Sequence, residues 1–416
     1  MRRFLKPASV ALLGGFCGFL PAQIAAVRDT VVMGPGYSSQ VYYSLQNGTV
    51  GTAPAAGWHL AFEIPIRGAA IRANHARGVT VYATSRDTSG WAALSLGDTT
   101  VRLYNDNCKW AVGAFNQTAA PNNPFDVGWG NYDLVTHITT GDSLYIVAIG
   151  SVYKKLWIRR LQGTSYYLRV ANLDGSQDTS YVVDKTLASG RNFVYLNLLT
   201  AQVLNLEPAA SDWDVVFTPY LEQVSGTPYP VTGVLQNLPV RTAKVVLSSQ
   251  ANPDTLTPGA YAFDSCAATI GYDWKRFDMS SNSFVVADTV YYLVQDGQGR
   301  IWRLRFLRFE GSSTGRVVLE KALLRQTASL VESASRRGLV VYPIPAQQSF
   351  QVELPQTPFV GRITLLNALG QPVWQQPVET IAPGMTFVRP AGLPNGLYGL
   401  VLESPAGRWT GKVIFD

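Results

Sequence analysis

Cysteine, histidine and methionine are scarce in this sequence. Its 416 residues include three Cys, three His and four Met. No His/Cys cluster has the spacing that a zinc site needs, so we expect no such site. Charged residues make up 15% of the chain and apolar residues 47%, a balance that excludes an intrinsically disordered protein.

The chain also lacks an apolar run long enough to span a membrane. The run Ala8–Leu20 covers about 13 residues, whereas roughly 20 are needed. Basic residues precede this run and small residues follow it, which predicts a secretory signal peptide over residues 1–26. Without its three basic residues, 31 Lys and Arg face 28 Asp and Glu, a net charge of +3. A charge this small predicts no nucleic-acid partner.

Short segments of alternating apolar residues dominate the C-terminal part. Residues 349–354, 362–366 and 399–403 show this alternation and are separated by turn residues. The pattern predicts a small β-sandwich over residues 339–416, preceded by a polar linker at 329–338.

The same segment resembles a known family at specific positions. The residues that carry the resemblance are Tyr342, Pro343, Pro345, Gly370, Gly396, Tyr398 and Lys412. They resemble the type A C-terminal sorting domain of the type IX (Por) secretion system of Bacteroidetes, although Ile344 replaces the family's usual Asn. The resemblance implies the type IX machinery as a partner, translocation across the outer membrane, and release or anchoring at the cell surface.

An internal duplication precedes the sorting segment. Six blocks recur in the same order, among them 41–45 with 194–198, 58–62 with 213–217, and 106–113 with 264–271, the last at identical internal spacing. We therefore predict two homologous units, residues 27–190 and 191–328.

The sequences of both units predict antiparallel β-structure. Their apolar residues alternate, and Tyr, Val, Trp and Ile are enriched. Trp58 and Trp213 occupy equivalent positions ahead of apolar strands and are expected to be core aromatics. His59 takes the place that Asp214 holds in the other unit and is expected to be a polar strand residue.

The two cysteines that follow the signal peptide, Cys108 and Cys266, also occupy equivalent positions. Equivalent positions in tandem domains usually lie far apart, so each is expected to be a small buried residue of its own unit. The alternative, a disulfide between them, stays open, because a secreted protein meets an oxidising compartment.

The second unit, and more loosely the first, resembles the HmuY family of haem-binding proteins. Residues 193–198, 211–217 and 290–304 carry this resemblance. In the family's haem binder two His hold the iron, and the second unit here has no His. The resemblance leaves His75 and His137 of the first unit as haem-ligand candidates.

No catalytic constellation emerges from the sequence. The G-x-S-x-G pattern at 311–315 precedes a strand-like run, and no His follows His137. We therefore expect a non-enzymatic binding protein, secreted or on the cell surface, with haem or another hydrophobic small molecule as its ligand. The alternative is a structural or adhesive surface protein without a small-molecule ligand.

Overall fold

The computed structural model describes residues 25–65, 68–325, 339, 341–342, 344–353, 359–367, 370–380, 384–404 and 407–416. The chain divides into two compact units, Met1–Thr327 and Ala328–Asp416. Residues 1–24 of the expected signal peptide and the whole expected linker, 329–338, lie outside the described residues.

The first unit consists of antiparallel sheets, so the mainly β fold expected from the sequence is confirmed. Sheet A has the order β1 (Ala26–Val32), β23 (Arg316–Arg325), β22 (Ile301–Phe309), β21 (Val290–Gln295) and β18 (Arg241–Val246). Sheet B has the order β17 (Thr227–Gln236), β16 (Val215–Val224), β2 (Ser39–Ser44) and β3 (Gly48–Pro54). Sheet C has the order β15 (Gln202–Leu204), β14 (Phe193–Asn197), β4 (Leu60–Glu63) and β5 (Ile71–Ala73).

Sheet D has the order β13 (Thr179–Asp184), β12 (Ser165–Asn172), β11 (Val152–Gln162), β10 (Ser143–Ile149), β6 (Val79–Asp87) and β7 (Thr99–Leu103). It also includes β8 (Gly130–Tyr132) and β9 (Ile138–Gly141), and a separate hairpin is formed by β19 (Lys275–Asp278) and β20 (Ser283–Val286). Short 3-10 helices connect the strands: η1 (Pro35–Tyr37), η2 (His75–Arg77), η3 (Thr88–Trp91), η4 (Leu96–Asp98), η5 (Ala114–Asn116), η6 (Lys185–Ala188), η7 (Pro253–Thr255), η8 (Pro258–Ala260) and η9 (Gly311–Ser313).

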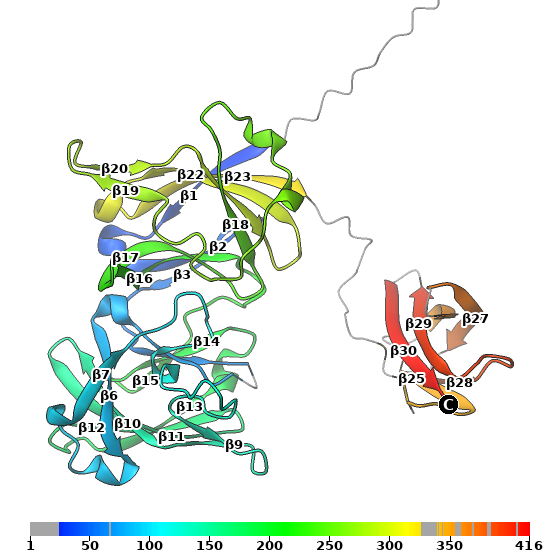
Figure 1. Cartoon of the computed structure of the whole chain (residues 1–416), viewed down its shortest axis with the longest axis horizontal. Coiled ribbons are helices and arrows are strands. Elements are labelled where there is room, and N and C mark those ends of the chain that lie inside the picture. The colour runs from blue at the N-terminus through cyan, green and yellow to red at the C-terminus, as the bar shows by residue number, and fades with distance from the viewer. Residues whose placement is uncertain are drawn as a thin grey trace, which may run out of the picture. The chain divides into compact units, whose positions relative to one another are not determined.

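The four sheets stack in the order A, B, C, D (Figure 1). One hydrophobic core joins sheets A and B and a second joins sheets C and D, so the unit is two β-sandwiches, AB and CD. A third apolar layer lies between sheets B and C. Strands β2, β4, β5 and β14 of these two sheets are thus buried on both faces.

Burial on both faces explains the nearly continuous apolar runs of these strands. In β2, Val41 and Tyr43 point into the core of AB, while Tyr42 between them points into the layer shared with CD. In β14, Val194 and Tyr195 divide in the same way. Alternate side chains of one strand therefore serve two different cores.

The two sequence repeats do not each form one sandwich. Strands β1, β2 and β3 of the first repeat complete sandwich AB, whose other strands belong to the second repeat. Strands β13, β14 and β15 complete sandwich CD, which otherwise consists of first-repeat strands. The predicted boundary at 190/191 falls between β13 and β14 and so leaves β13 in the first repeat. In the structure β13 pairs with β12 as β1 pairs with β23, so β13 corresponds to β1 and is the first strand of the second repeat. Each repeat has exchanged its first three strands with the other.

The exchange brings Cys108 and Cys266 together. They form a disulfide with a Cα–Cα distance of 4.0 Å across a sequence separation of 158 residues. The expectation of two separate buried thiols was wrong. It assumed that equivalent positions lie far apart, but the Cys108 loop and the Cys266 loop meet in the structure, where the Ala267 amide also donates to the Cys108 carbonyl oxygen at 3.0 Å.

The second unit is a two-sheet sandwich around one core, as expected for residues 339–416. One sheet has the order β24 (Val341–Tyr342), β25 (Ser349–Glu353) and β28 (Gly384–Val388). The other has the order β27 (Pro372–Thr380), β26 (Phe359–Leu366), β29 (Gly396–Ser404) and β30 (Gly407–Phe415).

The sorting-motif residues are spread over this sandwich. Tyr398 is buried in β29 and its hydroxyl donates to the Pro394 carbonyl oxygen at 2.9 Å. Gly370 lies in a turn with φ of 76°, and Pro345 follows a cis peptide bond. Tyr342 and Lys412 are exposed. Pro343 lies outside the described residues.

Candidate functional site: an aromatic cavity between two sandwiches

A cavity of about 130 Å³ lies between sheets B and C, where the two sandwiches meet. Eight aromatic side chains line it: Tyr42, Trp58, Tyr104, Trp110, Phe193, Tyr195, Trp213 and Tyr220. Since one water needs at least roughly 10–15 Å³ of such space, the cavity has room for about ten waters or for a small organic molecule.

The duplication builds the aromatic lining twice. Trp213 packs edge-on against Tyr42, with ring centroids 5.1 Å apart, and Trp58 packs in the same way against Tyr195 at 4.9 Å. The sequence places Trp58 opposite Trp213 and Tyr42 opposite Tyr195 in the aligned repeats. Both tryptophans are thus aromatics of the layer between the sandwiches.

Two asparagines at equivalent positions bind the two segments in which the chain passes from one sandwich to the other, beside the cavity. Asn74 Nδ2 donates to the carbonyl oxygens of Ala55 and Trp58 at 3.0 and 3.1 Å. Asn237 Nδ2 donates to those of Ala210 and Trp213, both at 2.8 Å. These bonds fix the segments that pass from one sandwich to the other, and with them the two tryptophans.

Arg72 of β5 brings a buried positive charge to the cavity wall. Its guanidinium donates to the backbone carbonyl oxygens of four residues, at 2.9 to 3.2 Å: Asp106, Lys109, Trp110 and Val112. It also lies over the Trp110 ring, 5.0 Å from the centroid. Burial lowers the pKa of Arg72 to about 10, so the group stays charged at neutral pH.

His75 of η2 also lines the cavity. Its Nδ1 lies 2.8 Å from the carbonyl oxygen of Val79, which can only accept, so Nδ1 carries the proton. Burial lowers the pKa of His75 to about 4, which keeps the ring neutral. Nε2 then offers a lone pair and, among the described residues, has no hydrogen-bond partner.

The structure does not bring His137 to this site. His137 is exposed on the turn between β8 and β9, with φ of 57°, and its Nδ1 pairs with the Tyr132 hydroxyl at 2.7 Å. His59 is buried and accepts a hydrogen bond from the Leu198 amide at 2.9 Å. Asp214 accepts one from the Leu45 amide at 2.7 Å, so these two polar strand residues do correspond.

Glu207 is the carboxylate of the cavity lining. It accepts hydrogen bonds from the Asn192 amide at 2.9 Å, from the Phe193 amide at 3.4 Å and from the Tyr195 hydroxyl. Burial raises the pKa of Glu207 to about 7, although these donors oppose the shift. No pattern in the sequence points to Glu207. Arg72 could have been noticed in the sequence, because it places a charged residue at a strand position where the other repeat has Leu235.

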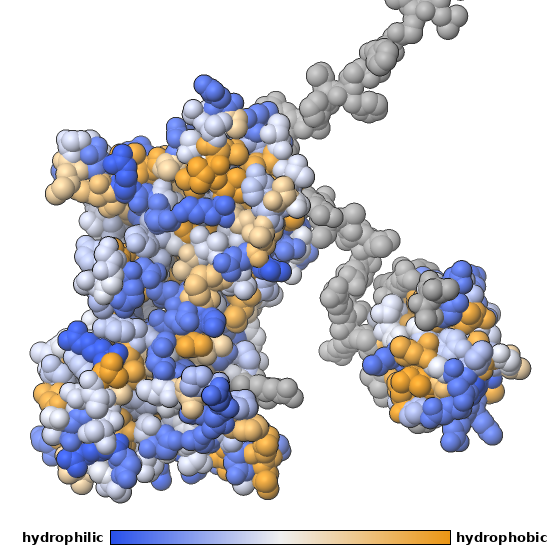
Figure 2. All heavy atoms as spheres, in the orientation of Figure 1, coloured by the Kyte–Doolittle hydropathy of each residue, from blue (hydrophilic) through white to orange (hydrophobic). Residues whose placement is uncertain are grey.

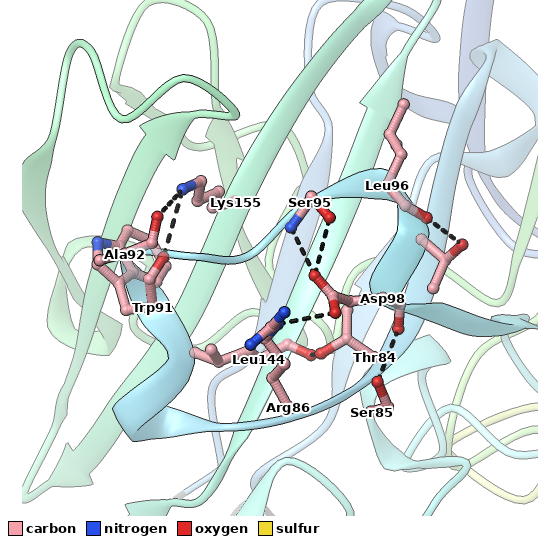
Figure 3. A network of polar contacts seen from close by, with 11 residues as sticks. Thr84, Ser85, Arg86, Trp91, Ala92, Ser95, Leu96, Asp98, Leu144 and Lys155 are labelled. Carbon is pink, nitrogen blue, oxygen red and sulfur yellow. Dashed lines mark hydrogen bonds and ion pairs between the residues drawn. The ribbon is translucent and has the colours of Figure 1, made fainter.

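A second polar network lies away from the cavity, around the connection of β6 and β7 (Figure 3). Arg86 pairs with Asp98 at 2.7 Å, and the Ser95 amide donates to Asp98 at 2.8 Å. The buried Lys155 ammonium donates to the carbonyl oxygens of Trp91 and Ala92 at 3.3 and 3.2 Å. This network fastens loops to sheet D and presents no pocket residue.

Figure 2 shows hydrophobic residues of the first unit in separate small groups among hydrophilic ones.

None of the helices in the described parts has the length and apolar character to span a membrane. Those parts also contain no group of three or more His, Cys, Asp or Glu placed to hold a metal ion.

Comparison with known proteins identifies the C-terminal segment. Residues 340–416 match the family described as "Secretion system C-terminal sorting domain". The protein carries a type IX sorting domain. This domain indicates export by type IX secretion to the cell surface or the extracellular space, and it implies interaction with the secretion machinery.

No curated protein matches the sequence. Among solved structures, the crystal structure of Dscam1 isoform 6.44, N-terminal four Ig domains, has 8% identity over 91% of this chain and 99% of that one. Its TM-score of 0.13 is too low to carry an argument. The resemblance of residues 27–328 to HmuY finds no support in these comparisons and stays a prediction.

Proposed function

We propose that this exported protein is a non-enzymatic binding protein, and that the cavity between sheets B and C holds a hydrophobic small molecule. The observation that carries the proposal is the aromatic lining, which both repeats supply. Binding sites for small organic ligands are typically concave, largely apolar and furnished with a few placed polar groups. Arg72, His75 and Glu207 are those groups here.

Unpartnered polar atoms in the lining support a ligand at this place. Trp58 Nε1, His75 Nε2, Trp213 Nε1 and Tyr220 Oη are buried without a hydrogen-bond partner among the described residues. Each such atom costs about 1–3 kcal/mol if it stays unpaired. A bound molecule with matching groups would remove that cost.

Haem has one supporting feature, the free Nε2 of His75, because a haem-ligating imidazole typically donates its other nitrogen to a carbonyl oxygen. His137 is not in the lining, and the lining contains no Met or Cys. A smaller aromatic molecule therefore fits the cavity better than haem does.

Calorimetric titration of the purified full chain with benzyl alcohol and with benzoate tests the function, and hemin is followed by its visible absorbance. We expect saturable one-to-one binding of at least one probe, and its loss in Ala76→Phe, since Ala76 lines the cavity. Ala93→Phe, at an exposed position, is the matched control. A hemin spectrum that depends on His75 and not on His137 would identify haem. No binding of any probe would overturn the proposal and favour the adhesive alternative.

A further inference from the structure

Donors outnumber acceptors among the unpartnered atoms of the cavity lining. The indole nitrogens of Trp58 and Trp213 can only donate, and the Tyr220 hydroxyl has a proton to give. Against these three stands one acceptor, His75 Nε2. Trp213 and Tyr220 are 3% and 7% exposed, so their partner would have to be a molecule inside the protein, a cavity water or a ligand. The lining therefore favours a ligand that supplies hydrogen-bond acceptors.

The charge of the lining points the same way. Arg72 forms no ion pair among the described residues; its partners are neutral carbonyl groups. The Glu207 carboxylate, which also lines the cavity, already accepts three hydrogen bonds from β14 and its preceding residue. The Asp106 and Glu63 carboxylates act on the guanidinium only from beyond ion-pair distance, so the position beside it can still accept an anion.

Comparison of the two repeats shows that the fold does not require this charge. The position of Arg72 is taken by Leu235 in the other repeat, and Leu235 also lines the cavity. There, Gln236 Nε2 donates to the Asp264 carbonyl oxygen, as Arg72 does to that of Asp106. The equivalent loop is thus held by a neutral side chain.

We propose that the cavity selects a small aromatic carboxylic acid, whose ring packs among the Tyr and Trp side chains and whose carboxylate lies beside Arg72 and accepts from the indole N–H groups. This inference rests on the proposed function and names the ligand class of the same site. A charge-assisted hydrogen bond is roughly twice as strong as a neutral one, which gives the carboxylate an advantage over a neutral group of the same shape.

The test compares benzoate with benzamide, its neutral counterpart, by calorimetric titration of the full chain. We expect benzoate to bind at least about tenfold more tightly, and Arg72→Leu to remove that preference. Arg72→Lys, which keeps the charge, should retain part of it. Circular dichroism checks that both variants fold. If Arg72→Leu does not fold, the preference for the carboxylate is tested with Arg72→Lys and with tryptophan variants.

Two tryptophan variants separate the indole donors from the ring. Trp213→Phe keeps an aromatic ring and should weaken benzoate binding severalfold. Trp274→Phe is the matched control, because Trp274 Nε1 is also buried and unpartnered but lies in the core of sandwich AB. Equal binding of benzoate and benzamide would overturn the ligand class and leave the proposed function standing. Binding of benzyl alcohol but not of benzoate would also overturn the ligand class and leave the proposed function standing. If no probe binds, the ligand class and the proposed function are both overturned.

Discussion

Glu207 makes stability depend on pH. Its pKa is raised from 4.5 to about 7 by burial, so between these values the folded protein binds more protons than the unfolded chain. Its contribution to the free energy of unfolding therefore falls as pH rises from about 4.5 to about 7. The change is on the order of 3 kcal/mol.

The measurement is chemical denaturation of the wild type and of Glu207→Gln at pH 5 and pH 8. The unfolding free energies of the two proteins must be compared at each pH, because other groups titrate in the same range. Burial raises the pKa of Asp214 to about 6 and lowers that of His75 to about 4. We expect the wild type to lose more stability than the variant from pH 5 to pH 8. An equal loss in both proteins would contradict the assignment.

The disulfide between Cys108 and Cys266 should contribute measurably to stability. It closes a loop across 158 residues and joins the two sandwiches. We expect the Cys108→Ala, Cys266→Ala double variant to lose about 2–5 kcal/mol of unfolding free energy, measured without reductant. With reductant the wild type and the variant should become nearly equal. A variant as stable as the oxidised wild type would disprove the contribution.

Single residues show how far the sequence alone could go. The equivalence of Cys108 and Cys266 was visible in the repeat, but their contact was not, because no local pattern tells which repeat a strand pairs with. Trp58 and Trp213 were expected to be core aromatics because they too occupy equivalent positions in the two repeats. Their place at a cavity follows from the packing of sheet B on sheet C, which is a long-range property.

Among the strands, β1 holds an unusual place at the edge of sheet A. It is the first strand of the described chain and pairs with β23, the last strand of the first unit, at seven positions from Ala26 to Val32. Alternation puts Val31 wholly inside the AB core and leaves Val32 53% exposed. The exchanged N-terminal strand is therefore anchored by one of two adjacent valines.

These neighbours give a matched pair of variants. Val31→Asp buries an unpaired carboxylate and should cost more than about 3 kcal/mol. Val32→Asp, on the exposed face of the same strand, should stay within about 0.5 kcal/mol of the wild type. Urea denaturation measures both. Similar losses in the two variants would mean that β1 does not close the core as described.

The sorting domain predicts where the whole molecule goes. Removal of residues 328–416, the second compact unit, should abolish export to the surface or the medium, since residues 340–416 carry the family match. Immunoblotting of cell, surface and medium fractions checks this outcome, with the intact chain as control. Undiminished export of the truncated chain would contradict the sorting role.

The exchange of three strands between repeats makes the first unit an interlocked whole. Periodicity along the sequence reveals strands and a duplication, so the β class and the repeat could be predicted. Pairing between β2 and β16, or between β4 and β14, joins segments far apart in sequence and leaves no local signature. Tandem domains and exchanged domains therefore look alike until the sheets are known.

Cutting the chain between the repeats distinguishes these two arrangements. The turn at 173–178, between β12 and β13, is largely exposed and can accept a protease site. Each resulting fragment supplies strands to both sandwiches. After cleavage, and with Cys108–Cys266 reduced, we expect the two fragments to elute together in size-exclusion chromatography and to separate only in denaturant. Tandem domains would separate on reduction alone, so separation without denaturant would refute the exchange.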